Sequence, residues 1–421
     1  PGEVAQVTRD RVAGFVTETG SRTSHVTIMA RSLEIPAVVG VGDELARELA
    51  DGVTLVVDGR TGRVLVDPDE STIAEYRKQV ADLAAVTREL MRFVDLPAET
   101  KDGVAVRLLA NVDQIDEARD ALRYGAEGIG LYRTEFLFLN RHDLPGEDEQ
   151  RAAYAAILSA VAPYSATIRT LDLGGEKVPT GLDLSDEPNP ALGLRGVRMS
   201  HNRPDVFRTQ LRALLRASTA GRLKILLPMV SSLAEVEFAR DTLDAVRREL
   251  AHEGESFDRD VPLGVMIETP AAAMIADMIA PLADFLSIGT NDLLQYTLAV
   301  DRSNEQVAYL YEPLHPAHLR MIQRIGQAAR RACIVVGMCG EMAGDPLHCW
   351  MLLALGIGEL SMAPFAIPLL KRILRDSTAA EARELLAEVL RLTSASEIRD
   401  RVEDRMRARF PVEFERSALQ G

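Results

Sequence analysis

Eight short apolar segments, each followed by a helical pattern, constrain the fold of this chain more than any other feature. They follow one another after Lys101 and read VRLLANV, GIGLYR, IRTLDL, KILLPMV, GVMIET, FLSIGT, VVGMCG and ELSM. Eight β-then-α units over about 300 residues match the (β/α)8 barrel in number and length. An open doubly wound sheet would also hold eight strands, but no glycine-rich dinucleotide turn follows the first one. We therefore predict an α/β protein with a C-terminal TIM barrel.

The sequence before the barrel predicts a smaller domain and a connecting helix. Short β-like runs separated by turns occupy residues 1–67, namely VAGFVTET, PAVVG, TLVVDG and GRVLVD. Residues 68–99 are rich in charge, carry apolar residues three and four apart, and are bounded by prolines. The predicted organisation is a β-rich domain over 1–67, a linker helix over 68–99 and the barrel over 100–421.

Composition excludes several classes of partner. The 421 residues carry a net charge of -15 and include no block of Lys or Arg, which argues against a nucleic-acid or anionic-membrane partner. No apolar run approaches the roughly 20 residues that span a bilayer, and the first residues do not have the pattern of a signal peptide. We expect a cytoplasmic protein. The three cysteines lack a zinc-type spacing, so neither a disulfide framework nor a structural metal site is expected.

Polar side chains recur where the predicted strands end. Catalytic groups of a (β/α)8 barrel gather at the carboxyl ends of its strands, so these residues predict an active site there. In chain order they are Asn111, Asp113, Arg133, Glu135, Asp172, Ser231, Glu268, Asn291, Asp292, Cys339, Glu341 and Ser361.

Two of these carboxylates are candidate metal ligands. Glu268 and Asp292 close the fifth and sixth predicted strands, which are neighbours in a barrel. Their oxygens can therefore converge on one hard cation and leave positions for substrate. Pairing of both carboxylates with arginines is an equally good interpretation at this stage.

Arginines lie close to the same strand ends. Arg133 ends the second predicted strand, Arg169 starts the third, Arg195 and Arg198 fall in the long insertion after it, and Arg302 follows the sixth. A planar guanidinium matches the fork of a carboxylate or phosphate better than the point charge of lysine does. The arginines therefore predict an anionic ligand, although any single one of them could be a surface ion pair.

Cys339 stands in GMCGEMAGD, where the loop after the seventh strand would face the barrel mouth. A thiol there could deliver a proton to carbon, or it could be a small buried hydrophobe. The second interpretation is the one we adopt for Cys333 and Cys349.

His25 stands in GSRTSHVTIMAR, at the predicted start of a helix with Thr23 or Ser24 as its cap. A phosphoryl group on its imidazole would meet the positive end of the helix dipole, and neutral imidazole is nucleophilic near pH 7. A cap or a core residue is the alternative. For His315, in LHPAHL, we expect a structural role.

Seven stretches of the chain together resemble enzyme I of the bacterial phosphoenolpyruvate:sugar phosphotransferase system. They occur in the order of the family's motifs and cover nearly the whole chain. They are GSRTSHVTIMARSLEIPAVVG, GLYRTEFLFLNR, RTLDLGGEK, NPALGLRGVR, VMIETPAA, FLSIGTNDLLQYTLAVDRSN and GMCGEMAGD.

The resemblance implies a role for each matching residue. His25 is similar to the histidine that becomes phosphorylated on a swivelling domain, and Cys339 to the residue that protonates the enolate. Glu268 and Asp292 match the Mg²⁺ ligands. The positions that match phosphoenolpyruvate contacts or lie in motifs near the substrate are Arg133, Arg169, Arg302, Asn291, Asp292, Arg195 and Lys177.

The resemblance also implies a reaction and its partners. The barrel would hold Mg²⁺ and phosphoenolpyruvate, His25 would take the phosphoryl group, pyruvate would leave, and the phosphoryl group would pass to the carrier protein HPr. The family forms homodimers through the barrel, so we expect the same here. The motifs do not select between the sugar and the nitrogen-regulatory branch.

The chain departs from the family in three places. Ser21 replaces a glycine before the Thr-Ser-His motif, and Glu176 replaces an aspartate. The family also carries a helical HPr-binding part before the region that this chain covers, so we expect a partial swivel domain and weak docking to HPr.

Two other functions are compatible with the pattern. A fragment of a pyruvate phosphate dikinase or phosphoenolpyruvate synthase would share the histidine and the barrel, but YRTEF, VDRSN and GMCGEMAGD favour enzyme I. A non-catalytic phosphoenolpyruvate-sensing barrel would be expected to lack a metal ligand or a reacting residue. Here Glu268, Asp292, Cys339 and His25 are all present.

Overall fold

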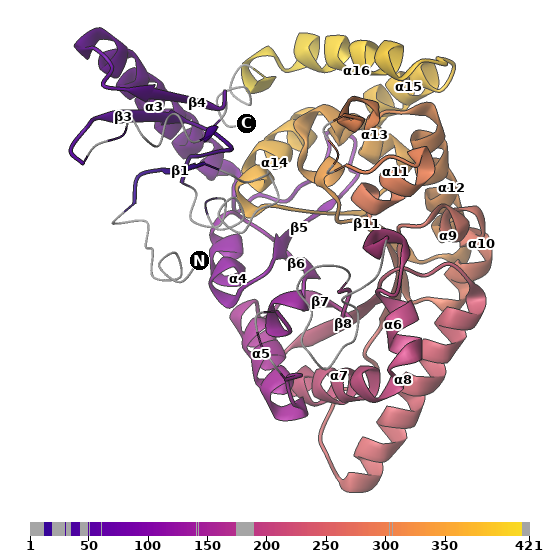
Figure 1. Cartoon of the computed structure of the whole chain (residues 1–421). Coiled ribbons are helices and arrows are strands. Elements are labelled where there is room, and N and C mark those ends of the chain that lie inside the picture. The colour runs from indigo at the N-terminus through magenta and orange to yellow at the C-terminus, as the bar shows by residue number, and fades with distance from the viewer. Residues whose placement is uncertain are drawn as a thin grey trace. The chain divides into compact units, whose positions relative to one another are not determined.

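The structure is a computed structural model that describes residues 12–18, 30, 35–42, 49, 51–59, 61–139, 141, 143–173, 189–302, 304 and 306–414. The chain forms two compact units (Figure 1), one of Pro1–Glu89 with Pro411–Gly421 and one of Leu90–Phe410. The first of the two chain boundaries between these units, Glu89/Leu90, falls inside the stretch that is predicted as a linker helix.

Within the part of the first unit that the structure describes lie four short strands and a long helix. β1 (Phe15–Thr17) pairs in parallel with β2 (Ala37–Val39), and β3 (Leu55–Asp58) pairs antiparallel with β4 (Arg63–Val66). The Asp58 carboxylate closes the β3–β4 turn by accepting from the Thr61 amide at 3.1 Å and hydroxyl at 2.7 Å. α3 (Glu70–Leu90) follows, so strands and a helix occur within the segments that predict them.

The second unit is a closed barrel of eight parallel strands, as the sequence predicts. Its order is β10-β11-β12-β5-β6-β7-β8-β9, so every strand lies beside its neighbours in sequence and β12 closes on β5. The strands are β5 (Arg107–Val112), β6 (Gly128–Tyr132), β7 (Ser165–Arg169), β8 (Arg222–Leu227), β9 (Leu263–Ile267), β10 (Phe285–Ile288), β11 (Val335–Met338) and β12 (Glu359–Met362).

Helices surround these strands (Figure 1). They are α4 (Ile115–Arg123), α5 (Glu147–Ala160), α6 (Val197–Asn202), α7 (Pro204–Ala217), α8 (Leu233–Glu253), α9 (Pro270–Met274), α10 (Ala276–Ile279), α11 (Thr290–Leu298), α12 (Pro316–Ala332), α13 (Cys349–Leu355), α14 (Ile367–Asp376), α15 (Ala379–Val389) and α16 (Ala395–Arg409). None of the described helices is long and apolar enough to cross a membrane.

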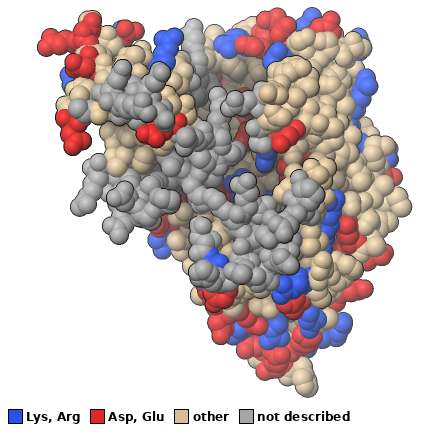
Figure 2. All heavy atoms as spheres, viewed as in Figure 1, with Lys and Arg blue, Asp and Glu red and all other residues tan. Residues whose placement is uncertain are grey.

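Charged side chains of both signs cover the region of α5, α7 and α8 (Figure 2). Arg212 of α7 bonds Glu147 of α5 and Glu253 of α8, both at 2.7 Å, and Arg216 also bonds Glu147 at 2.7 Å. This network joins three neighbouring helices of the outer ring.

Local sequence signals account for several helix ends. α8 begins with a capping box between Ser232 and Glu235 and ends at Gly254, whose φ of 76° is left-handed. α12 begins after His315, whose Nδ1 accepts from the Ala317 amide at 3.2 Å. The structural role expected for His315 is therefore confirmed.

Side chains fill the amino-terminal end of the barrel. The Phe285 ring lies against Gly264, where an added Cβ would come within 2.3 Å of it. Glu359 accepts from Arg107 at 2.7 Å and from Lys224 at 3.3 Å. A packed interior at this end is typical of the fold and leaves the opposite end for chemistry.

The predicted position of Arg169 is wrong by most of a strand. The pattern IRTLDL places Arg169 at the start of the third strand, whereas it is the last residue of β7. The strand begins earlier, in the weakly apolar Ser-Ala-Thr sequence, and residues 170–173 are buried but lie outside the ladder. The correction moves Arg169 to the carboxyl end of the barrel.

Candidate active site

A chain of ion pairs crosses the carboxyl end of the barrel. Arg169 bonds the Glu135 carboxylate at 3.0 Å on one side and Asp172 Oδ2 at 3.1 Å on the other. Asp172 then accepts from Arg195, with Nε at 2.9 Å from Oδ1 and Nη2 at 2.7 Å from Oδ2. Burial alone would raise the pKa of Asp172, but the two guanidinium groups hold it below its usual range.

The chain of ion pairs continues to the first turn of α11. Arg195 Nη2 also donates to Asp292 Oδ2 at 3.0 Å, and Arg302 Nη2 lies 3.8 Å from Asp292 Oδ1. The predicted arginine pairing is therefore correct for Asp292. Arg302 is about half-exposed at the edge of the site, whereas the Arg195 side chain is largely buried.

Glu268 follows β9 directly and is buried, and no arginine among the described residues bonds it. Its Oε1 accepts from the Met229 amide at 2.6 Å, and Met229 has a left-handed φ of 59°. Burial raises the pKa of Glu268, and the nearby carboxylates of Asp292 and Asp172 add to the effect. A bound cation would offset this repulsion between the carboxylates.

The carboxylates fit a divalent cation with oxygen preference. Gly289 lies opposite Glu268, and a Cβ there would come within 2.8 Å of Oε2, so the glycine keeps the space beside this oxygen open. Among the residues that the structure describes, no group of three or more His, Cys, Asp or Glu side chains is placed to hold a metal. Two carboxylates are nevertheless what Mg²⁺ commonly takes from a protein, with water and substrate oxygens completing its shell.

Arg133 and Glu135 come from the loop after β6. Arg133 Nη1 bonds Asp113 at 3.1 Å, and about half of the arginine side chain remains exposed. Glu135 Oε1 accepts from Arg169 and from the Asp172 amide at 3.1 Å, while its buried Oε2 has no hydrogen-bond partner among the residues that the structure describes. Burial raises the pKa of Glu135.

Asn291 lies beside Asp292 in the first turn of α11 and joins two loops. Its side-chain oxygen accepts from the Glu341 amide at 3.0 Å, and its main-chain oxygen accepts from the Tyr311 hydroxyl at 3.0 Å. The amino-terminal turn of a helix also offers unpaired N–H groups to an anion.

Cys339 follows β11 directly and is held from several sides. The Ser287 hydroxyl of β10 donates to its sulfur at 3.4 Å, and the Asn111 amide of β5 donates to its carbonyl oxygen at 2.9 Å. The Ser361 hydroxyl in turn orients Asn111 at 2.7 Å. Burial raises the pKa of the Cys339 thiol, so it carries a proton at neutral pH.

Two residues of this arrangement are missing from the sequence prediction. Ser287 is a hydroxyl inside an otherwise apolar strand, which is the signal that could have identified it. Tyr296 lies one helical turn after Asp292, on the same face of α11, and its hydroxyl accepts from Arg195 at 3.3 Å.

Two predicted site residues, His25 and Lys177, lie outside the described residues, as does Glu176. The structure brings together the others: Arg133, Arg169, Arg195, Glu268, Asn291, Asp292, Arg302 and Cys339 all lie at or directly after the carboxyl ends of strands or in the loops that follow them.

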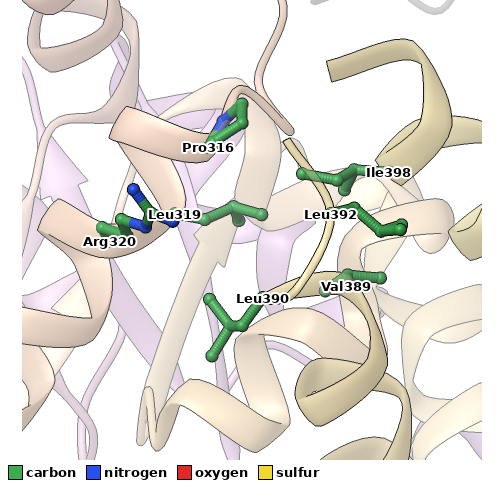
Figure 3. A pocket seen from close by; sticks show the side chains of 7 residues that line it. All are labelled: Pro316, Leu319, Arg320, Val389, Leu390, Leu392 and Ile398. Atoms are coloured by element: carbon green, nitrogen blue, oxygen red, sulfur yellow. The ribbon is translucent and has the colours of Figure 1, made fainter. Parts of the chain in front are cut away.

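A separate apolar depression lies between α12, the end of α15 and α16 (Figure 3). It is shallow and is lined by Pro316, Leu319, Arg320, Val389, Leu390, Leu392 and Ile398. None of these residues belongs to the cluster at the strand ends.

Two family models match the chain. The model described as "PEP-utilising enzyme, PEP-binding domain" matches residues 87–379, and "PEP-utilising enzyme, mobile domain" matches residues 1–62. Among solved structures, a citrate lyase from Burkholderia xenovorans LB400 covers 75% of this chain and 95% of its own with a TM-score of 0.40 and 14% identity, too weak a likeness to inform the site.

Curated relatives are similar over most of the chain, and each is named phosphoenolpyruvate-protein phosphotransferase. The protein of Staphylococcus carnosus is 45% identical over 91% of this chain and 67% of its own length. The Bacillus subtilis protein is 46% identical over 87% and 64%, and that of Haemophilus influenzae 43% identical over 91% and 67%. The chain thus spans about two thirds of the length of these relatives. It belongs to the PEP-utilising enzymes, and among them to the phosphoenolpyruvate-protein phosphotransferase family.

Proposed function

We propose that this chain transfers the phosphoryl group of phosphoenolpyruvate to its own His25 and leaves pyruvate. The observation that carries the proposal is the convergence of four arginines and two candidate metal ligands at the carboxyl end of one barrel. Phosphoryl transfer depends mainly on positioning and charge neutralisation, which such a cluster supplies.

The charge of the cluster supports a role for a divalent cation. Among the described residues, four guanidinium groups face five carboxylates, from Asp113, Glu135, Asp172, Glu268 and Asp292. The site has a net negative charge when all five are ionised, a state that the raised pKa values of Glu135 and Glu268 oppose and that a bound cation would favour. Without a cation, a highly charged anion such as phosphoenolpyruvate would be repelled by the fully ionised site. Mg²⁺ held by Glu268 and Asp292 would reverse the sign and neutralise charge on the substrate's oxygens.

The remaining residues would divide the work between binding and proton transfer. Arg133, Arg169 and Arg302 would orient the phosphate and carboxylate of the substrate. As the bond between phosphorus and the enol oxygen breaks and a bond to the His25 imidazole forms, the enolate of pyruvate remains. The Cys339 thiol would then give its proton to the methylene carbon, which completes pyruvate, and the thiolate would regain a proton from water.

The thiol suits this step because it is protonated. Burial raises the pKa of Cys339, and the Ser287 hydroxyl donates a hydrogen bond to its sulfur. That hydroxyl would stabilise the thiolate that forms when the proton leaves. Asn291 and Lys177 would complete the substrate site.

The onward partner and the assembly follow from the family alone. The phosphohistidine would pass its phosphoryl group to HPr, and two copies would associate through the barrel. The names of the curated relatives favour this function over the dikinase alternative.

The test is to incubate the chain with Mg²⁺ and phosphoenolpyruvate carrying labelled phosphate. The expected result is acid-labile, base-stable label on the wild-type chain and none on His25→Ala. A His315→Gln variant, altered at a capping histidine, should still be labelled. Equal labelling of wild type and His25→Ala would refute the assignment of the phosphorylated residue.

A further inference from the structure

Arg195 joins two carboxylates that have different tasks in the proposed function. Its Nε and Nη2 bond both oxygens of Asp172, at 2.9 and 2.7 Å, while Nη2 also bonds Asp292 Oδ2 at 3.0 Å. Asp292 is a proposed metal ligand and Asp172 is not. The same guanidinium therefore touches an oxygen that a metal ion would need.

The backbone fixes the base of this side chain. Gly196 has a left-handed φ of 58°, and a Cβ there would come within 2.7 Å of the Met229 Cβ. The next residue, Val197, donates its amide to the Pro228 carbonyl at 3.2 Å. Because the main chain is packed this closely against the segment after β8, only the end of the Arg195 side chain can adjust when a ligand arrives.

The two contacts of Arg195 are unequal. The bond to Asp172 is a two-pronged fork, and Asp172 is also held by Arg169 at 3.1 Å. The bond to Asp292 is a single contact to one oxygen. Paired forks are the stronger arrangement, so the Asp292 contact is the one that a small divalent cation would displace.

We infer that Arg195 is an internal counter-ion for Asp292 in the metal-free site, and that a divalent cation displaces it from Asp292 while Asp172 keeps hold of it. The inference rests on the proposed metal site. Without a cation, the carboxylates of Asp172, Glu268 and Asp292 would repel one another in a buried place, and Arg195 offsets this repulsion. The same contact makes Arg195 compete with the metal for the Asp292 carboxylate.

The displacement would also prepare the site for its substrate. Once Asp292 binds the metal, Nη2 of Arg195 loses one anionic partner. The N–H group that bonded Asp292 is then available to an incoming anion. Metal and anion would then bind in a favoured order, metal first, and each would strengthen the binding of the other.

The experiment measures metal binding directly, without any turnover. Mn²⁺ accepts the same oxygen ligands as Mg²⁺, and the electron paramagnetic resonance signal of free Mn²⁺ reports how much is bound to the 421-residue chain. Arg195→Met removes the charge at similar volume and should bind Mn²⁺ more tightly than wild type, by about tenfold, because a positive neighbour of the cation is gone. Arg195→Gln, which keeps a donor toward Asp172, is carried in parallel in case the first variant does not fold.

The matched control is Arg198→Met. Arg198 lies in the same insertion but donates to the Leu192 and Gly193 carbonyls at 3.0 and 3.2 Å, with no hydrogen bond or ion pair to Asp292. Its Mn²⁺ affinity should equal that of wild type. A gain seen equally in Arg198→Met would mean that the insertion, and not the charge of Arg195, controls the affinity, and would overturn the inference.

The remaining outcomes separate the inference from the proposed function. If wild type binds Mn²⁺ and Asp292→Asn does not, the result supports the proposed metal site at Glu268 and Asp292. Unchanged or weaker Mn²⁺ binding by both Arg195 variants then overturns the counter-ion role alone. If Asp292→Asn binds Mn²⁺ as well as wild type does, the metal site itself is wrong, and the inference fails with it.

Discussion

Cys339 combines features of the two interpretations that the sequence leaves open. Its side chain packs in a buried cluster with Leu131, Leu226, Met266 and Phe285, as a small hydrophobe would. Its sulfur nevertheless accepts a hydrogen bond from Ser287 at 3.4 Å. The apolar surroundings raise the pKa of the thiol further, so burial favours the protonated form that a proton donor needs.

Replacing Cys339 should separate the proton-transfer step from the phosphoryl-transfer step. Exchange of the methyl hydrogens of pyruvate with deuterium oxide, followed by NMR, reports proton transfer by itself. We expect Cys339→Ala to lower the exchange rate at least about a hundredfold, the usual contribution of a positioned acid or base. Ser287→Ala should lower it less, because the thiol remains.

The control for this prediction is Cys333→Asn, at an exposed position whose left-handed φ of 57° asparagine tolerates. Its exchange rate should match wild type. Normal exchange in Cys339→Ala would exclude Cys339 as the proton donor.

His318 links stability to pH. Burial lowers its pKa from 6.5 to about 4. The unfolded chain therefore binds a proton at a higher pH than the folded chain does, and stability is present above pH 6.5 and lost as the pH falls toward 4. At pH 5 this one residue should cost about 2 kcal/mol relative to pH 7.

The prediction is tested by urea unfolding at pH 7 and pH 5, followed by the fluorescence of Trp350, the single tryptophan. His318→Gln should lose about 2 kcal/mol less stability than wild type between these two pH values. An identical loss in both proteins would mean that His318 titrates normally in the folded state.

At the scale of elements, the sequence predicts the strands well and one boundary badly. The eight apolar runs identify every strand of the barrel because strands buried on both faces are almost continuously apolar. The same rule fails at β7, where buried residues continue past the end of the ladder. Apolar character records burial, and residues 170–173 are buried in a loop. Hydrogen-bond pairing, which ends the strand, leaves no such signal.

The packing of β9 against β10 gives a prediction at this scale. Gly264 leaves room for the Phe285 ring, and a Cβ would come within 2.3 Å of it. Gly264→Ala should therefore lower the free energy of unfolding by about 1–3 kcal/mol, as overpacking in a core usually does.

Gly146→Ala is the matched control, since no atom lies within 4 Å of the Cβ that it would add. It should unfold close to the wild-type urea concentration. Equal stability of the two variants would show that the barrel accommodates the Gly264 methyl group by shifting Phe285.

At the scale of the whole molecule, the proposed reaction divides between two compact units. The proposed metal and substrate residues that the structure describes all belong to Leu90–Phe410, whereas His25 belongs to the other unit and lies outside the described residues. The positions of Arg133 and Glu268 near the barrel mouth could be predicted because each lies directly after a strand end. The pairing of the site residues with one another could not, since it depends on how distant loops approach one another in space.

The division predicts that Leu90–Phe410 folds alone and binds Mn²⁺ but takes no label from phosphoenolpyruvate. Residues near both ends of this fragment contact the rest of it and should stabilise its fold. The buried Lys371 ammonium donates to the Val94 carbonyl at 2.6 Å, and the Phe410 ring packs edge-on against Trp350. Circular dichroism and thermal unfolding would check the fold.

A shorter fragment that starts at Pro97 is the comparison. It lacks the Val94 carbonyl and leaves Lys371 one acceptor short, so it should be less stable by about 1–3 kcal/mol. If Leu90–Phe410 is unfolded while the full chain is folded, the barrel depends on the rest of the chain.

The most direct test of the central claim, a metal-dependent phosphoenolpyruvate site in the barrel, is titration calorimetry of phosphoenolpyruvate into His25→Ala, in which the substrate cannot be consumed. The account predicts binding with Mg²⁺ and an affinity at least about a hundredfold lower without it, because the metal would neutralise negative charge on the substrate's oxygens. Adding Glu268→Gln to the His25→Ala variant should abolish the gain in phosphoenolpyruvate affinity that Mg²⁺ gives. Equal binding of phosphoenolpyruvate with and without Mg²⁺, or a Glu268→Gln variant that responds to Mg²⁺ as its parent does, would contradict it.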